Sequence, residues 1–254
     1  MEEDCPGMDP VEISWLKKEP GTAGILIEGL PGIGHVGKLV AEHMIEEFHA
    51  EKVAELFSIH FPPQVIIEPD GVARLARNEV YVSGGETPFA FLIGDYQSAS
   101  AEGHYLLAEA YLDIAERLGV HRIYTLGGYG VGHLVSTPRV LSAVNREELR
   151  AGVEAAGAQF NRDEPPGGIV GASGLLLGLS RRRGMDAVCL MGETSGYLVD
   201  PRAASSLLAV LSALIGVEVD KSQLETRAAE MEQFLAKITE SERAGDDEAL
   251  RYIG

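Results

Sequence analysis

The chain has only two cysteines and one tryptophan among its 254 residues, and aromatic residues make up 6% of it. Cys5 lies in an expected terminal tail and Cys189 in an apolar run, so we expect neither a disulfide framework nor a zinc site. Basic residues are also few, since 21 Lys and Arg stand against 39 Asp and Glu, a net charge of −18. So acidic a surface repels phosphate backbones and anionic lipids, which argues against a protein that binds nucleic acid or membranes.

Long hydrophobic runs are missing as well. No apolar stretch reaches 18 residues without a charge or a turn signal, so we expect no membrane span. The start, Met1–Asp4, is acidic and differs from the basic beginning of a signal peptide, so we expect a cytoplasmic protein. Apolar residues still make up 45% of the chain, which suffices for an ordinary globular core.

Short apolar runs typical of strands alternate with helical periods as far as Gly216. Strands are expected at 23–28, 51–61, 89–94, 122–126, 140–145 and 187–191, and helices at 36–48, 102–118, 146–156 and 201–215. The turn signal Pro69-Asp70-Gly71 predicts an antiparallel excursion within 64–83. The alternation as a whole predicts an α/β fold, with a mostly parallel sheet flanked by helices on both faces.

The pattern changes after the last expected helix. We expect 11–218 to form the α/β core, 219–240 an amphipathic helical extension, and 241–254 a flexible acidic linker and tail. The extension carries a heptad seam made of Leu224, Ala228, Met231, Leu235 and Ile238. Two interpretations stay open: a coiled coil that joins subunits, or a single amphipathic helix packed on its own domain.

The segment Gly32–Gly37 matches the dinucleotide-binding pattern G-x-G-x-x-G between an expected strand and an expected helix. That pattern also requires an acidic residue about 20 residues further on, and here the corresponding region, Phe57–His60, has none. We therefore favour a structural interpretation, in which the glycines form a tight turn and let the helix pack closely on the sheet. Enzyme chemistry remains the alternative.

An enzyme site would use side chains at the ends of strands. Asp95 and Glu193 each follow an apolar run, where acid–base residues of α/β proteins often lie, although such carboxylates also cap helices and tie loops. The expected crevice consists of Gly32, Gly34, His35, Gly37, Asp95, Gly128 and Glu193. The alternative function is a hydrolase or phosphorylase of nucleosides or nucleotides. The histidines show no paired-ligand spacing, so we expect no metal, no cofactor and no assigned catalytic residue.

Three stretches occur in a characteristic order: Gly29–Gly37, the glycine segment Gly127–Gly130, and the block Gly192–Tyr197 followed by Asp200–Ala204. Together they resemble the proteasome assembly chaperone family, in particular its archaeal branch, over residues 11–240. The resemblance implies a nucleoside-phosphorylase-like α/β fold without catalysis or ATP dependence. It also implies a homo-oligomer, a tetramer or pentamer, that binds proteasome α-subunits or the core particle and assists assembly or activation.

The chain ends in Leu250-Arg251-Tyr252-Ile253-Gly254 after a polar, acidic stretch. The resemblance implies that this tail docks into pockets between α-subunits through a hydrophobic–tyrosine–any-residue ending, although Tyr252 here stands third from the end. Tyrosine is a suitable anchor, since it combines a large apolar ring with a hydroxyl, and the terminal carboxylate of Gly254 can pair with a basic residue. Several tails on one oligomer raise the apparent affinity through effective concentration.

Overall fold

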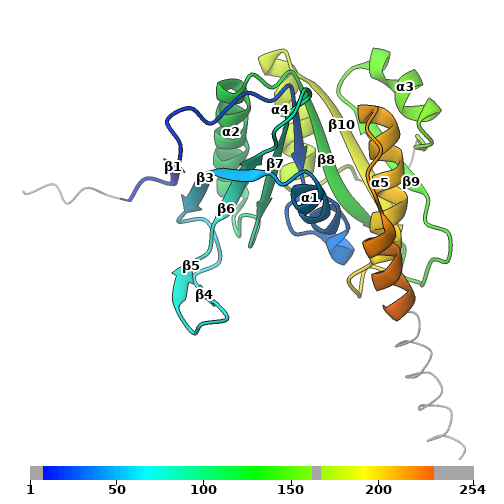
Figure 1. Cartoon of the computed structure of the whole chain (residues 1–254), viewed down its shortest axis with the longest axis horizontal. Coiled ribbons are helices and arrows are strands. Elements are labelled where there is room, and N and C mark those ends of the chain that lie inside the picture. The colour runs from blue at the N-terminus through cyan, green and yellow to red at the C-terminus, as the bar shows by residue number, and fades with distance from the viewer. Residues whose placement is uncertain (1–7, 162–166, 232–254) are drawn as a thin grey trace, which may run out of the picture.

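The structure is a computed structural model that describes residues 8–161 and 167–231 (Figure 1). Its strands are β1 (Val11–Trp15), β2 (Ile25–Glu28), β3 (Glu51–Ser58), β4 (Val65–Ile67), β5 (Ala73–Leu75), β6 (Asn78–Val82), β7 (Phe89–Gly94), β8 (Arg122–Gly130), β9 (Val140–Val144) and β10 (Asp186–Thr194). Its helices are η1 (Ile33–His35), α1 (Val36–Glu47), α2 (Ala101–Leu118), η2 (Glu147–Leu149), α3 (Arg150–Ala155), α4 (Ala172–Ser180), η3 (Arg181–Arg183) and α5 (Pro201–Ile215).

Eight strands form one sheet in the order β1-β3-β6-β7-β2-β8-β10-β9. The four central strands β7, β2, β8 and β10 run parallel, and antiparallel pairs extend the sheet on both sides. The predicted α/β fold is thus confirmed. The predicted antiparallel excursion is also present: β4 and β5 form a separate hairpin that projects from the domain, and the chain then enters the sheet as β6 (Figure 1).

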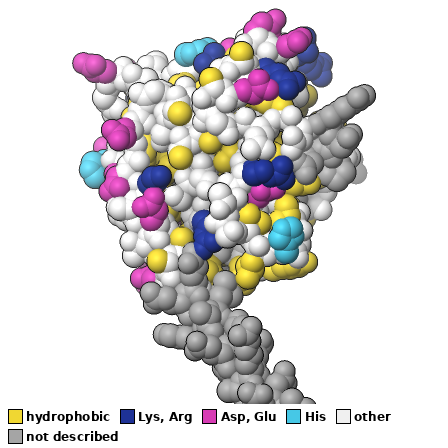
Figure 2. Space-filling model, turned by 90° about the vertical axis from the view of Figure 1, so that its right-hand side faces the viewer, with side chains coloured by type: hydrophobic (Ala, Val, Ile, Leu, Met, Phe, Trp, Pro, Cys, Tyr) yellow, Lys and Arg dark blue, Asp and Glu magenta, His cyan; other side chains and the backbone are white. Residues whose placement is uncertain are grey.

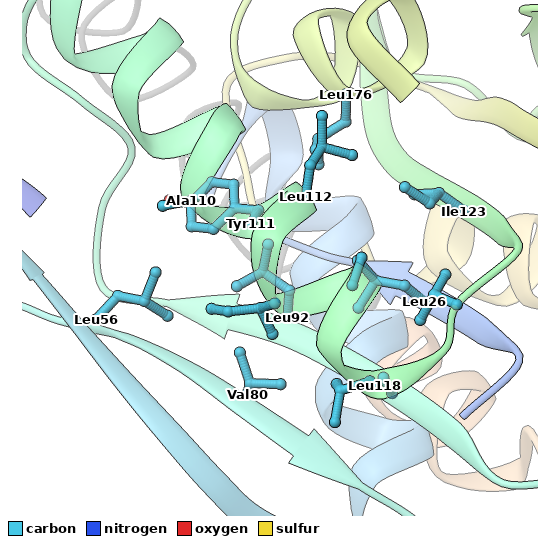
Figure 3. Packing of buried hydrophobic residues seen from close by; sticks show 14 of the residues in the cluster. Leu26, Leu56, Val80, Leu92, Ala110, Tyr111, Leu112, Leu118, Ile123 and Leu176 are labelled. Atoms are coloured by element: carbon cyan, nitrogen blue, oxygen red, sulfur yellow. The ribbon is translucent and has the colours of Figure 1, made fainter. Parts of the chain in front are cut away.

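Helices cover both faces of the sheet and enclose two hydrophobic cores. One core packs α2 and α4 against the sheet, and Figure 3 shows Leu112 and Leu176 from these helices beside the strand residues Leu26 and Ile123. The other core packs α1, α5 and α3 on the opposite face and contains Ile27 of β2. Neighbouring residues of a strand point to opposite faces, so β2 serves both cores.

The ends of the long helices follow local signals in the sequence. The Ser100 hydroxyl accepts a hydrogen bond from the backbone N–H of Gly103 at the start of α2. The Asp200 carboxylate caps α5 in the same way, and Pro201 occupies the first turn. Gly216 ends α5 in the left-handed region with φ 68°. The helix predicted at 201–215 is confirmed residue for residue.

Two strands are longer than predicted, and one strand was not predicted at all. Strands β8 and β10 continue past their predicted ends at Leu126 and Met191 into the glycine segments, and Gly128 pairs with Gly192 in their parallel register. Gly128 lies under η1, because a Cβ atom there would be 2.1 Å from the carbonyl oxygen of Ile33. The unpredicted strand β1 pairs antiparallel with β3 at the edge of the sheet.

The start of the helical extension packs on its own domain. Residues 222–231 are helical, and Leu224, 1% exposed, joins the core formed by α1 and α5. The imidazole of His43 in α1 contacts the carbonyl oxygen of Asp220 just before this helix. Ala228 and Met231 are half-buried, while Leu235 and Ile238 lie outside the described residues, as do 241–254. At Leu224, therefore, the single-helix interpretation holds.

Candidate functional site

The Gly32–Gly37 segment forms a tight turn rather than an open loop. Its short helix η1 contains Gly34 with φ 63° and His35 with φ 51°, and α1 begins directly afterwards. A Cβ atom on Gly37 would lie 2.2 Å from the carbonyl oxygen of Leu126 in β8. The glycines therefore allow α1 to pack closely on the sheet, which supports the structural interpretation of this motif. Gly34 and Gly37 are buried, whereas Gly32 and His35 are exposed.

Asp95 follows β7 and ties the β4–β5 hairpin to the domain. Its carboxylate accepts hydrogen bonds from the Arg74 guanidinium at 2.5 and 3.0 Å and from the backbone N–H of Arg77 at 2.9 Å. Burial opposes ionisation of Asp95, but these donors outweigh it and hold its pKa below the usual value. A carboxylate engaged in this way is a poor general base.

Glu193 lies near the end of β10 and holds the segment that precedes β9. Its carboxylate accepts hydrogen bonds from the Arg139 backbone N–H at 3.1 Å and from Nε of the same residue at 2.9 Å. These bonds with Arg139 lower the pKa of Glu193. Glu193 lies on β10 and Asp95 directly follows β7. These two strands are three positions apart in the sheet, which separates them by about 14 Å. The structure therefore does not join the two predicted carboxylates in one acid–base site.

The most buried carboxyl group of this region was not among the predicted site residues. Glu28, at the end of β2, is 0% exposed, and it accepts hydrogen bonds from the Leu30 N–H at 3.0 Å and the Ser173 hydroxyl at 2.9 Å. Burial raises the pKa of Glu28 to about 7. The signal in the sequence was an acidic residue that directly continues an apolar strand.

Gln97 joins the neighbouring segments. Its side-chain amide donates to the Pro31 carbonyl at 2.8 Å and accepts from the backbone N–H of Ala172 at 2.9 Å. It thereby links the turn before α1 to the start of α4. Ser173 is bonded to Glu28 in the same region, so Gln97, Ser173 and Glu28 are all engaged by protein groups. Within the described ranges, no group of His, Cys, Asp and Glu is placed to hold a metal ion.

A thermal-shift screen with nucleosides and nucleotides is expected to leave the Tm of the wild-type protein unchanged, because Asp95, Glu193 and Glu28 are already engaged by protein groups. A ligand present at 100 times its Kd would stabilise the fold by about 2.7 kcal/mol, which such a screen detects easily. A saturable rise in Tm with any of these compounds would contradict this prediction. It would revive the alternative of a nucleoside or nucleotide hydrolase or phosphorylase.

Comparisons with known proteins agree on one family. The model of the PAC2 family matches residues 26–239. An uncharacterized protein of Methanocaldococcus jannaschii is 42% identical over 245 residues, which cover 93% of this chain and 94% of that protein. In the part of the chain that the structure describes, no helix is long and apolar enough to cross a membrane.

Two crystal structures from Pyrococcus furiosus are similar over nearly the whole fold. PbaB, an archaeal proteasome activator, has a TM-score of 0.85 and 38% identity, covering 91% of this chain and all of that one. PbaA, an archaeal homologue of proteasome-assembly chaperone, has a TM-score of 0.78 and 26% identity, covering 96% and 97%. The resemblance found in the glycine and Gly-Glu-Thr motifs is thus confirmed, and the chain belongs to the PAC2 family.

Proposed function

We propose that this protein is a non-enzymatic, ATP-independent chaperone or adaptor in the cytoplasm that binds proteasome α-subunits or the core particle and assists assembly or activation. The observation that carries the proposal is its similarity to the proteasome activator PbaB, which extends over all of the PbaB chain. The engagement of Asp95 and Glu193 by arginines supports a non-enzymatic role, because neither carboxylate is available as a base.

The contact with the proteasome is assigned to the tail Leu250–Gly254, which lies outside the described residues. Leu250, Tyr252 and Ile253 supply large apolar surface, and a tyrosine ring is among the side chains most often found at the centre of strong interfaces. Arg251 adds a positive charge that can pair with a carboxylate of the partner. A tail this short binds weakly by itself, so the proposal includes a homo-oligomer that presents several tails at once.

An apolar face on the β4–β5 hairpin supports self-association. Val65 pairs with Leu75, and Ile67 pairs with Ala73. The side chains of Val65, Ile67 and Leu75 are between 51% and 63% exposed. Cross-strand partners point to the same face, so the hairpin presents a continuous apolar surface. Such a surface is typical of contacts between proteins. Ala228 and Met231 remain candidates for the same role in the helical extension.

Deletion of Leu250–Gly254 is expected to abolish capture of purified proteasome α-subunits, because it removes every proposed anchor. The measurement is a pull-down with immobilised full-length or truncated protein. Circular dichroism and light scattering should show an unchanged fold and subunit number. Tyr252→Ala should weaken capture strongly, whereas Glu240→Ala, upstream of the tail, serves as the control. Undiminished capture by the truncated protein would contradict the proposal.

A further inference from the structure

A groove of about 710 Å³ follows the outer edge of the sheet beside β9. It is lined by the backbone and side chains of 142–147 on one side, and by Arg150, Phe160, Asn161 and Arg181 elsewhere. The groove lies at the edge of the sheet that ends in β9 and shares no lining residue with the strand-end residues described above. Figure 2 faces this side of the molecule and shows Lys and Arg side chains near its top, with Asp and Glu side chains among them.

The backbone of β9 is only partly paired along this groove. One edge pairs with β10, and on the other edge the Gln159 backbone accepts from the Ser142 N–H and donates to the Val140 carbonyl, both at 2.8 Å. In a strand, the N–H and C=O groups of one residue point toward the same edge, and those of the next residue point toward the opposite edge. The Ser142 carbonyl and the Val144 N–H therefore face the groove, and no backbone group of the described residues pairs with them.

Three guanidinium groups line the groove, although the chain as a whole has a net charge of −18. Arg181 is exposed and forms no ion pair within the described residues. Arg146 approaches the Asp186 carboxylate at 3.4 Å, but its buried Nε finds no hydrogen-bond partner in the described part of the chain. Arg150 bonds to Glu154 at 2.9 Å and lies over the ring of Phe160 at 4.8 Å. Among the described lining residues, only Glu147 carries a carboxylate.

We propose that this groove binds an extended acidic segment of a partner protein, which adds a strand to the free edge of β9 and pairs its carboxylates with Arg146, Arg150 and Arg181. A peptide backbone offers both the donor that the Ser142 carbonyl needs and the acceptor that the Val144 N–H needs. A phosphate group offers acceptors only, so the edge favours a peptide over a nucleic acid. Carboxylates on alternate residues of the added strand point to one side, toward the guanidinium groups.

The test measures fluorescence anisotropy of a short labelled peptide of alternating glutamate and valine with the full-length protein. Arg181→Glu should weaken binding about tenfold or more, since a charge-assisted hydrogen bond is lost and a repulsion is added. Arg182→Glu is the matched control, because the neighbouring exposed residue undergoes the same charge change outside the groove lining and should leave the affinity nearly unchanged. A peptide of the same sequence with every backbone nitrogen methylated should bind at least tenfold more weakly, because it lacks backbone donors.

Three results would overturn the proposal. Equal losses for Arg181→Glu and Arg182→Glu would indicate unspecific attraction between charges. Full binding of the N-methylated peptide would rule out an added strand. Tighter binding after the combined change Asp246→Asn, Asp247→Asn and Glu248→Gln would mean that the acidic end of the chain itself occupies the groove. The inference does not depend on tail docking, because deletion of Leu250–Gly254 should leave binding of the peptide intact.

Discussion

Replacement of Gly37 by alanine is expected to destabilise the fold by about 3 kcal/mol or more. The new Cβ atom would lie 2.2 Å from the carbonyl oxygen of Leu126, 2.6 Å from its carbon and 3.0 Å from its Cβ. Both sides of this contact are backbone of regular elements, α1 and β8, so no side-chain rotation relieves it. The helix must move away from the sheet, which opens the core around Val36 and Val40.

Gly178→Ala is the matched control for Gly37→Ala. Gly178 also lies inside a helix, α4, but it is exposed, and a Cβ atom there would meet nothing of the described structure within 4 Å. Alanine has the higher helix propensity, so this variant should gain up to about 1 kcal/mol. Urea denaturation of both variants gives the two free energies of unfolding. If both substitutions prove equally harmless, α1 does not approach β8 as closely as described.

Glu28→Gln is expected to stabilise the protein by about 3 kcal/mol at pH 8 and to have little effect at pH 4. Burial raises the pKa of Glu28 to about 7 from the ordinary 4.5. Between these two values the folded chain holds a proton that the unfolded chain has released. Stability from this group is therefore full below pH 4.5, falls as the pH rises to about 7, and stays low above that. Glutamine is neutral throughout and avoids the loss.

The amide introduced by Glu28→Gln would also fit the contacts that are present, since its oxygen can accept from the Leu30 N–H and its nitrogen can donate to the Ser173 hydroxyl. Free energies of unfolding at pH 4 and pH 8 measure the effect. Glu193→Gln provides a control of opposite sign, because Arg139 lowers the pKa of Glu193 and its contribution is lost as the pH falls. If Glu28→Gln raises the free energy of unfolding equally at pH 4 and pH 8, the carboxyl group of Glu28 does not have the raised pKa given above.

The sequence predicted those parts of the fold that depend on neighbouring residues. Apolar alternation and helical periods gave the α/β class and most of the elements. Local caps, Asp200 before the helix and Gly216 after it, set both ends of α5 at the predicted residues. Strand β1 was missed because its apolar residues Val11, Ile13 and Trp15 form a short segment near the N-terminus, and its pairing with β3 depends on residues more than 30 positions away.

The site depended on contacts across the sequence, which only the tertiary structure decided. Asp95 and Glu193 were correctly placed near strand ends, but the order of the strands sets them apart and supplies Arg74 and Arg139 as their partners. The bond between Glu28 and Ser173 spans 145 positions, and no local pattern encodes it. A carboxyl group takes its pKa from burial and nearby charge, and both follow from packing rather than from neighbours in the chain.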